Sequence, residues 1–262
     1  MNTLFQCKAK FYEQYRPKFP EALFQFLEER LGLNAKCKSE KLLDLGCGTG
    51  QLAIPLSRYF NEVIAVDPSS DMLSEAKIAA EKADCFNICW IESCAEDLPE
   101  TLGKFELITI ANAFHWMDHE MVVPWILRHL QNNGFLVLAG SYKSFWQGGA
   151  DWQKVLFKIV DEWFGQEKER IMGYVQKYKF PWEDKLSQYS FSSINVHKLA
   201  EERTWSIEKL IGLLYSMSFI DRKKVEHQIG KFEQEIKEAL LSISPDDRFI
   251  ENHEISVILA KK

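Results

Sequence analysis

The sequence lacks a long hydrophobic run, a secretion signal and paired cysteines. No apolar stretch in its 262 residues approaches the roughly 20 that a membrane-spanning helix requires. The amino-terminal residues include Lys8 and Lys10 but no apolar segment of the kind that secretion signals carry. The six cysteines form no Cys-x-x-Cys pair, so neither a zinc site nor a disulfide framework is indicated. We therefore expect a cytoplasmic protein with reduced thiols, no metal and no membrane partner.

The chain also lacks a long basic block. Its formal net charge is −6, and its lysines and arginines are scattered. Because phosphate-binding proteins usually carry a basic footprint, this balance disfavours DNA or RNA as the main partner, although it does not exclude a local basic patch. We expect a small-molecule partner, and either a monomer or a homodimer.

Strand and helix patterns alternate along the chain. Strand patterns lie at 41–45, 62–66, 86–91, 105–110, 135–139 and 254–260. Helix patterns lie at 21–31, 52–60, 69–82, 118–130 and 225–240. This order indicates βαβ units, and hence a parallel sheet with helices on both faces. Pro55 fits the second helix only within its first turn, where backbone N–H groups lack partners anyway.

The stretch 142–189 breaks this alternation and is rich in tryptophan, with Trp146, Trp152, Trp163 and Trp182. We interpret it as a helical insertion. Its aromatic side chains either form a lid that excludes water and selects an apolar or planar substrate, or form the small core of a helical cap. On the first interpretation, Tyr142 and Trp146 contact the substrate.

The most informative segment, LLDLGCGTG at 42–50, is a hydrophobic strand that leads into three glycines and then a helix. Glycine permits a sharp turn with positive φ and lets a ligand approach the backbone. The N-terminus of the following helix favours an anionic group. A second strand ends at Asp67, where a carboxylate can accept hydrogen bonds from both hydroxyls of a ribose. The two features together predict a site for an adenosine-containing cofactor.

The glycine spacing discriminates among nucleotides. The dinucleotide pattern GxGxxG would place its third small residue at Gln51, which is large. The phosphate-binding pattern GxxxxGK[ST] does not occur. The observed pattern is GxGxG with Asp44 two residues ahead of it. A dinucleotide and a nucleoside triphosphate are therefore disfavoured.

LLDLGCGTG followed by VIAVDPSSDML resembles motif I and the acidic loop of class I S-adenosylmethionine-dependent methyltransferases. Within that class, the chain is similar to the type 11 group and its trans-aconitate methyltransferase-like relatives. Further matches lie at 12–17, 95–99 and 111–116. The resemblance is strong over about 11–140, weaker over 201–262 and almost absent across the aromatic stretch.

The resemblance implies a Rossmann-like, doubly wound α/β fold. Its seven-stranded sheet would be mostly parallel, with the last strand antiparallel. Residues 1–142 and 193–262 would form the S-adenosylmethionine-binding domain, including an N-terminal helix, and 143–192 would form the helical, aromatic-rich cap. The implied cofactor is S-adenosylmethionine, which leaves as S-adenosylhomocysteine, and no metal is expected.

The resemblance also assigns residues to the cofactor. They are Tyr15, Arg16, Asp44, Gly46, Cys47, Gly48, Thr49, Gly50, Asp67, Pro68, Met72, Ala95, Glu96 and Asn112. Asp44 and the glycine loop would hold the methionine amine and carboxylate, and Asp67 would hold the ribose. Relatives often have Asp where this chain has Cys94, so either Glu96 contacts the adenine amino group or that contact is lost.

Methyl transfer itself requires little beyond an aligned nucleophile, because the sulfonium methyl is already activated. A general base is needed only where the nucleophile must lose a proton, which a carboxylate does not. His115 follows the fourth strand and is the candidate base, but His115 and Trp116 can equally shape the substrate pocket. His119 and His129 lie on a predicted helix, which favours structural or surface roles.

Three functions are compatible with these motifs: a methyltransferase for a small molecule, one for RNA, DNA or protein, and a binding protein without catalysis. The chain lacks the [DNS]PP[YF] run and the Pro-Cys nucleophile of enzymes that methylate DNA or glutamine. Together with the acidic balance, these absences favour the first. A non-catalytic binding protein is not excluded, because no single residue is indispensable to the chemistry.

Overall fold

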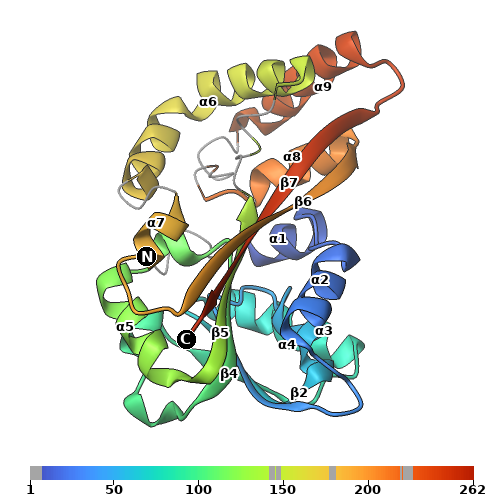
Figure 1. Cartoon of the computed structure of the whole chain (residues 1–262). Helices are drawn as coiled ribbons and strands as arrows, with labels where there is room; N and C mark the ends of the chain where they lie inside the picture. Colours follow the sequence, from blue (N-terminus) through green and yellow to red (C-terminus); the bar gives the residue numbers. More distant parts are fainter. Residues whose placement is uncertain (1–7, 142–144, 146–148, 177–180, 219, 221–226) are drawn as a thin grey trace. The chain divides into compact units, whose positions relative to one another are not determined.

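The computed structural model describes residues 8–141, 145, 149–176, 181–218, 220 and 227–262, and for 141 and 167–176 it describes the backbone only. These residues contain a seven-stranded sheet with the order β3-β2-β1-β4-β5-β7-β6 (Figure 1). The strands are β1 (Ser39–Leu45), β2 (Phe60–Asp67), β3 (Ile88–Glu92), β4 (Phe105–Ala111), β5 (Leu130–Ser141), β6 (Ser193–Trp205) and β7 (Phe249–Lys261). The α-helices are α1 (Ala9–Tyr15), α2 (Glu21–Leu31), α3 (Ala53–Leu56), α4 (Ser70–Lys82), α5 (His119–His129), α6 (Asp151–Gln176), α7 (Trp182–Leu186), α8 (Ile207–Tyr215) and α9 (Ile229–Ile243).

The direction of the strands confirms the fold class predicted from the sequence. β1 pairs in parallel with β2 and β4, β2 with β3, and β4 with β5. β7 runs antiparallel to β5. This direction follows from a hydrogen bond of 3.0 Å, in which the N–H of Lys262, just after the end of β7, donates to the carbonyl of Gly134 near the start of β5. The strand order reverses between β1 and β4, which is where doubly wound folds bind ligands.

Neighbouring residues of β1 point to opposite faces of the sheet and into separate hydrophobic cores. Leu43 belongs to the core that contains Val122 and Ile126 of α5, whereas Leu42 belongs to the core that contains Leu27 of α2. Figure 1 shows α5 and α7 on one side of these strands and α2 and α3 on the other. Strands buried on both faces read as continuous hydrophobic runs, and β1 and β2 have that pattern.

The sequence located most of these elements, and some of its boundaries were wrong. α2 spans the predicted residues and ends at Gly32, whose φ of 64° forms a left-handed cap. The helix predicted at 52–60 is α3, which ends at Leu56 and is followed by the 3₁₀ turn η1 (Ser57–Tyr59). Phe60 instead pairs with Ser39 as the first residue of β2. β3 starts at Ile88 rather than at Phe86, which is 79% exposed.

The sequence did not locate β6, α8 or α1. β6 is rich in charged residues and mostly exposed, so its hydrophobic alternation is weak. α8 had a readable signal, since the Ser206 side chain caps its N-terminus and its apolar residues recur at helical spacing. α1 is only seven residues long, too short for a periodicity to appear. Of the helix predicted at 225–240, residues 225 and 226 lie outside the described residues, and 229–240 belong to α9.

The chain divides into two compact units. The sheet unit comprises 18–140, 178–199 and 255–262, and the helical unit comprises 1–17, 141–177 and 200–254. The predicted cap at 143–192 therefore has its first part in the helical unit and its last part, which includes α7, in the sheet unit. The domain boundaries drawn from the resemblance stay a prediction. Among the described residues, no helix combines the length and the apolar character that crossing a membrane requires.

Aromatic side chains form the core of the helical unit. The ring of Trp152 lies 5.8 Å from that of Phe145 and 5.7 Å from that of Phe249, and its indole donates to the carbonyl of Ile250 at 3.1 Å. Farther along α6, the ring of Trp163 contacts Phe232 of α9 at 5.4 Å. These two tryptophans therefore pack within the helical unit, as the second interpretation of the aromatic stretch expects.

α1 packs on α8 at a glycine. A Cβ on Gly212 would lie 2.2 Å from Cγ of Tyr15, so the ring rests directly on the α8 backbone. The Lys8 ammonium, which precedes α1, donates to the carbonyls of Met217 at 2.6 Å and Ile220 at 2.8 Å, beyond the end of α8. The position of Tyr15 thus depends on the absence of a side chain at residue 212.

We predict that Gly212→Ala destabilises the protein by about 1–3 kcal/mol, the usual cost of overpacking, although alanine is the better helix former. The reason is that the ring of Tyr15 must move. Gly230→Ala is the matched control, because Gly230 lies in α9 of the same unit and a Cβ there would meet no atom within 4 Å. Urea unfolding should show a loss for the first variant only. Equal stability of the two variants would contradict this packing.

Candidate functional site

The glycine loop after β1 turns through three residues with positive φ. These are Gly46 at 65°, Gly48 at 55° and Gly50 at 82°. The loop is fixed to β2, because the N–H of Cys47 donates to the carbonyl of Val66 at 2.9 Å. The conformation predicted from the sequence is therefore present, and it starts at the strand end that faces the switch point.

Each glycine has a different role in packing. A Cβ on Gly46 would lie 2.5 Å from that of Ala113, and a Cβ on Gly50 would lie 3.0 Å from the indole of Trp90. A Cβ on Gly48, in contrast, would have no atom within 4 Å. The first and third glycines thus allow close packing within the protein, whereas the second is half-buried and borders open space from which a ligand can approach the backbone.

Asp44 is buried beneath the loop, with 1% of its surface exposed. Its carboxylate accepts hydrogen bonds from the Thr109 hydroxyl at 2.7 Å and from the N–H of Ala53 at 3.1 Å. Burial raises the pKa of Asp44 to about 7, although these two hydrogen bonds oppose the shift. Asp44 therefore joins β1 to β4 and to the start of α3.

Asp67, at the end of β2, accepts one hydrogen bond on each oxygen. Gly48 N–H donates to Oδ2 and Ser69 N–H donates to Oδ1, both at 2.9 Å. Burial raises the pKa of this carboxyl, and the two hydrogen bonds oppose the shift. A carboxylate has about four acceptor positions, so about two remain for hydroxyl donors of a ligand.

Thr49 contributes a buried hydroxyl whose partner is missing. The residue is 2% exposed, and its Oγ1 has no hydrogen-bond partner among the described residues. A buried polar atom without a partner is costly and therefore calls for an explanation. The loop thus combines open backbone, a carboxylate with acceptor capacity and an orphaned hydroxyl, which together fit a polar ligand such as the predicted cofactor.

The residues predicted for the adenine surround the ends of β2 and β3. Met72 and Ala95 are both buried, with 4% and 8% of their surfaces exposed. Glu96, in the 3₁₀ turn η2 (Ala95–Asp97), accepts a hydrogen bond from the N–H of Asp118 at 2.7 Å. Burial raises the pKa of the Cys94 thiol, and nearby Glu96 adds to the shift. Pro68 precedes Ser69, which caps α4.

Asn112 follows β4 in a left-handed conformation with a φ of 50°, which is uncommon outside glycine. Its backbone N–H donates to the carbonyl of Ala139 at 2.9 Å. Its side-chain oxygen lies 2.7 Å from the place where a Cβ of Gly140 would stand. Gly140 therefore makes room for the Asn112 amide, and the sequence analysis did not identify it.

His115 and Trp116 belong to the 3₁₀ turn η4 (Phe114–Trp116), next to an aromatic wall. The His115 ring lies nearly parallel to that of Trp182, with centroids 6.3 Å apart and an interplanar angle of 16°. The ring of Trp116 lies 5.0 Å from that of His115. Trp182 comes from α7, so the end of the predicted cap contributes to this part of the sheet unit.

The two histidines of α5 are structural, as the sequence analysis favoured. His119 is buried, stacks on Phe114 and shares a hydrogen bond of 2.8 Å with that residue's carbonyl. Burial lowers the pKa of His119, which keeps the ring neutral. His129 stacks on Trp125 with centroids 3.7 Å apart and contacts its carbonyl at 2.8 Å.

Four of the predicted site residues do not belong to the described part of the sheet unit. Tyr15 and Arg16 belong to the helical unit, where Arg16 Nε donates to the Ser216 hydroxyl at 2.8 Å. Tyr142 and Trp146 lie outside the described residues. Among the residues that the structure does describe, no group of three or more His, Cys, Asp or Glu side chains could hold a metal ion.

Besides Gly140, three residues of the site were not found from the sequence. Thr109 binds Asp44, Trp90 packs on Gly50, and Trp182 lines the region of His115. Thr109 had a weak signal, as a polar residue inside an apolar strand pattern. The other two had none, because their roles depend on which strands and helices become neighbours.

Known proteins are similar to this chain in sequence and in fold. A family model described as a methyltransferase domain matches residues 42–134. An uncharacterized methyltransferase of Mycobacterium tuberculosis is 24% identical over 82% of this chain and 86% of its own length. A Saccharomyces cerevisiae protein named as an S-adenosylmethionine-dependent methyltransferase is 34% identical over 47% of this chain. The matched part spans 42% of that relative's own length.

A solved structure has the same fold. A type II methyltransferase from Anaeromyxobacter dehalogenans has a TM-score of 0.59 at 19% identity, and the match covers 94% of this chain and 96% of the other. At this identity the likeness concerns the fold. Taken with the methyltransferase domain matched at 42–134 and the sequence relatives, it makes the chain similar to the S-adenosylmethionine-dependent methyltransferases in both sequence and fold.

Proposed function

We propose that this protein transfers the methyl group of S-adenosylmethionine to a small molecule that carries a carboxylate or a hydroxyl group. The observation that supports the cofactor site best is the open backbone at Gly48, between the Asp67 carboxylate and the buried Thr49 hydroxyl. When bound, the cofactor supplies a methyl group on a sulfonium. A nucleophile can attack this methyl carbon directly, and S-adenosylhomocysteine is the leaving group. The resemblance to trans-aconitate methyltransferase-like proteins favours a carboxylate.

Asp67 is the residue we assign to the ribose. Its two oxygens each keep acceptor capacity beside the hydrogen bonds from Gly48 and Ser69, which suits two neighbouring hydroxyls. We assign the methionine end to Asp44 and to the loop residues Gly46, Cys47, Gly48, Thr49 and Gly50. Asp44 would act there through its charge, because both of its oxygens already accept hydrogen bonds.

The adenine would lie against Pro68, Met72 and Ala95. Of the two candidates for its amino group, Glu96 is ionisable but already binds the N–H of Asp118. Cys94 is held as a thiol by its raised pKa and is a weak acceptor. We therefore assign that contact to Glu96, whose second oxygen can accept a further hydrogen bond.

The substrate would lie beside Asn112, His115 and Trp116. The parallel rings of His115 and Trp182 favour a planar or apolar portion of the substrate. We assign Tyr15 and Arg16 to the cofactor's amino-acid end, and Tyr142 and Trp146 to the substrate, from the resemblance and the sequence alone. We further propose a cytoplasmic monomer or homodimer.

A screen of small carboxylates, alcohols, phenols and amines, read by release of S-adenosylhomocysteine, tests the proposal. We predict turnover with a small carboxylate or hydroxyl compound. If the substrate is a hydroxyl compound, His115→Asn should lower kcat about 10²–10⁴-fold, the usual contribution of a general base. With a carboxylate the same variant should change kcat little. Turnover on tRNA or protein, with none on small molecules, would overturn the proposal.

We predict that Gly48→Ala abolishes cofactor binding in a folded protein, because the new methyl group occupies the open backbone. Gly32→Ala is its matched control: Gly32 has a φ of 64° against 55°, and its Cβ would also meet no atom within 4 Å. Each variant should lose about 1 kcal/mol of stability. Cofactor at a concentration of 100 times its Kd should stabilise wild type and Gly32→Ala by about 2.7 kcal/mol. Their melting temperatures should therefore rise by several degrees. An undiminished shift in Gly48→Ala would contradict the site.

We also predict that cofactor binding releases about half a proton at pH 7, because the free carboxyl of Asp44 has a pKa of about 7 and a nearby ammonium lowers it. Affinity should rise as pH increases toward 7 and level off above it. Calorimetry in two buffers with different ionisation enthalpies measures the released proton. Asp44→Asn should remove that release. Proton uptake, or the same release in the variant, would contradict the assignment.

A further inference from the structure

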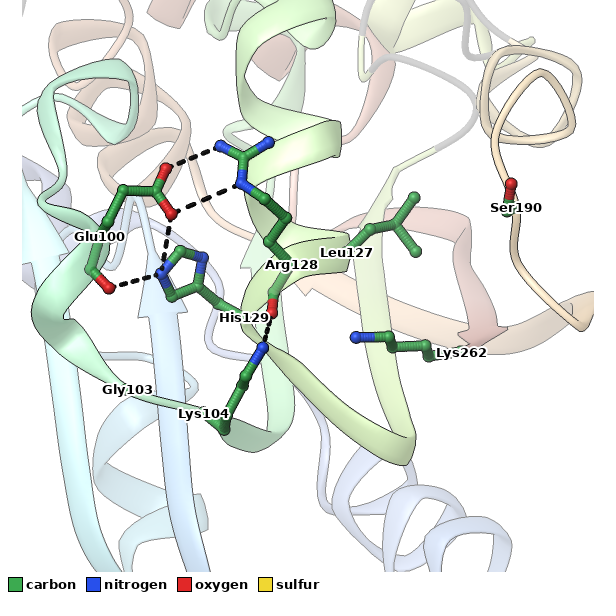
Figure 2. A pocket seen from close by; sticks show the side chains of 8 residues that line it. All are labelled: Glu100, Gly103, Lys104, Leu127, Arg128, His129, Ser190 and Lys262. Atoms are coloured by element: carbon green, nitrogen blue, oxygen red, sulfur yellow. Dashed lines mark hydrogen bonds and ion pairs between the residues drawn. The ribbon is translucent and has the colours of Figure 1, made fainter.

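A pocket lies at the opposite edge of the sheet from the glycine loop, and all of its lining belongs to the sheet unit. Three of its residues lie next to strand ends. Lys104 directly precedes β4, His129 directly precedes β5, and Lys262 directly follows β7. The cavity measures about 640 Å³, within the usual range for small-molecule sites. Figure 2 shows its lining, which the proposed methyltransferase site does not use.

The side chains around this pocket are predominantly cationic. Lys104, Arg128 and Lys262 each carry a positive charge, against the single carboxylate of Glu100. Glu100 pairs with Arg128, whose Nη2 lies 2.7 Å from Oε1. The guanidinium and this carboxylate therefore largely neutralise one another. The ammonium groups of Lys104 and Lys262 form no ion pair within 4 Å with this carboxylate among the described contacts. The hydrogen bond from Arg128 lowers the pKa of Glu100, and the charge of Lys104 helps to lower it further.

Both ammonium groups are held by backbone carbonyls near the end of α5. Lys104 donates to the carbonyl of Arg128, and Lys262 donates to that of Leu130 at 2.8 Å. An ammonium has three N–H donors, so each lysine keeps about two for another acceptor. Figure 2 shows the two side chains reaching from different segments toward the same region below Arg128.

The two charges act on each other. Burial lowers the pKa of Lys262, and the nearby charge of Lys104 lowers it further. An anion bound between them would relieve this repulsion. A carboxylate carries one negative charge, whereas a phosphate monoester carries about 1.5 to 2 at pH 7 and presents three acceptor oxygens. The phosphate group matches two convergent ammonium groups better.

We propose that this pocket binds a phosphate-bearing small molecule through Lys104 and Lys262. The ligand's phosphate would accept hydrogen bonds from both ammonium groups, and the exposed Ser190 hydroxyl lines the same cavity. The acidic balance of the whole chain favours a small molecule over a nucleic acid. This inference does not depend on the proposed substrate.

Equilibrium dialysis of the full chain with labelled inorganic phosphate, at constant ionic strength, tests the proposal. We expect one saturable site per chain, with affinity reduced at least 10-fold in Lys104→Gln and in Lys262→Gln. Lys77→Gln is the control, because Lys77 is an exposed lysine on α4, away from the pocket. It should leave phosphate binding unchanged. All four proteins should keep the same thermal shift with S-adenosylmethionine, which separates this test from that of the methyltransferase site.

Three results would overturn the proposal. The first is phosphate binding that does not saturate, and the second is equal binding by wild type and both pocket variants. The third is displacement of the phosphate by a short RNA at lower concentration than by a sugar phosphate, because that would identify a nucleic-acid contact. If one lysine variant unfolds, the other still decides the outcome, since the two side chains come from segments far apart in the sequence.

Discussion

The buried carboxylate of Asp44 is the interaction on which the cofactor site depends. It lies at the reversal of strand order and binds the Thr109 hydroxyl on β4 and the first backbone N–H of α3. Without it, the strand on one side of β1 and the helix after the glycine loop would lose their common anchor. Its pKa near 7 indicates that this anchoring has an electrostatic cost, which a cationic ligand nearby would reduce. The same residue thus supports the fold and favours the binding of a cationic group at the loop.

Asp67 plays a complementary part on the other side of β1. Its hydrogen bonds to Gly48 and Ser69 hold the loop and the start of α4 at a fixed separation before any ligand arrives. Preorganisation of this kind lowers the entropic cost of binding. The structure therefore keeps its polar groups at the carboxyl edge of the strands, while both faces of the sheet are occupied by apolar cores.

The sequence was sufficient for features that depend on local physics. The three glycines, Asp67 and the Gly32 cap are recognisable because backbone conformation and strand order follow from short segments. β6 was not recognisable, since its charged residues conceal the alternation and only its pairing with β7 makes it a strand. The same reason applies to Gly140 and Trp182, whose partners lie far away in the sequence. Contacts of this kind are fixed by tertiary packing.

Cysteine chemistry shows one consequence of this burial. Cys47 lies within the glycine loop and Cys94 directly precedes Ala95, so the proposed cofactor assignment would place a sulfur-alkylating reagent near both thiols. A thiolate is the nucleophilic form, and burial raises the pKa of both thiols, that of Cys47 well above its usual value. The carboxylates of Asp44 and Asp67 raise the pKa of Cys47 further. On the proposed assignment of the cofactor, the carboxylates at the loop would therefore also disfavour the thiolate of Cys47, the form that a methyl donor alkylates.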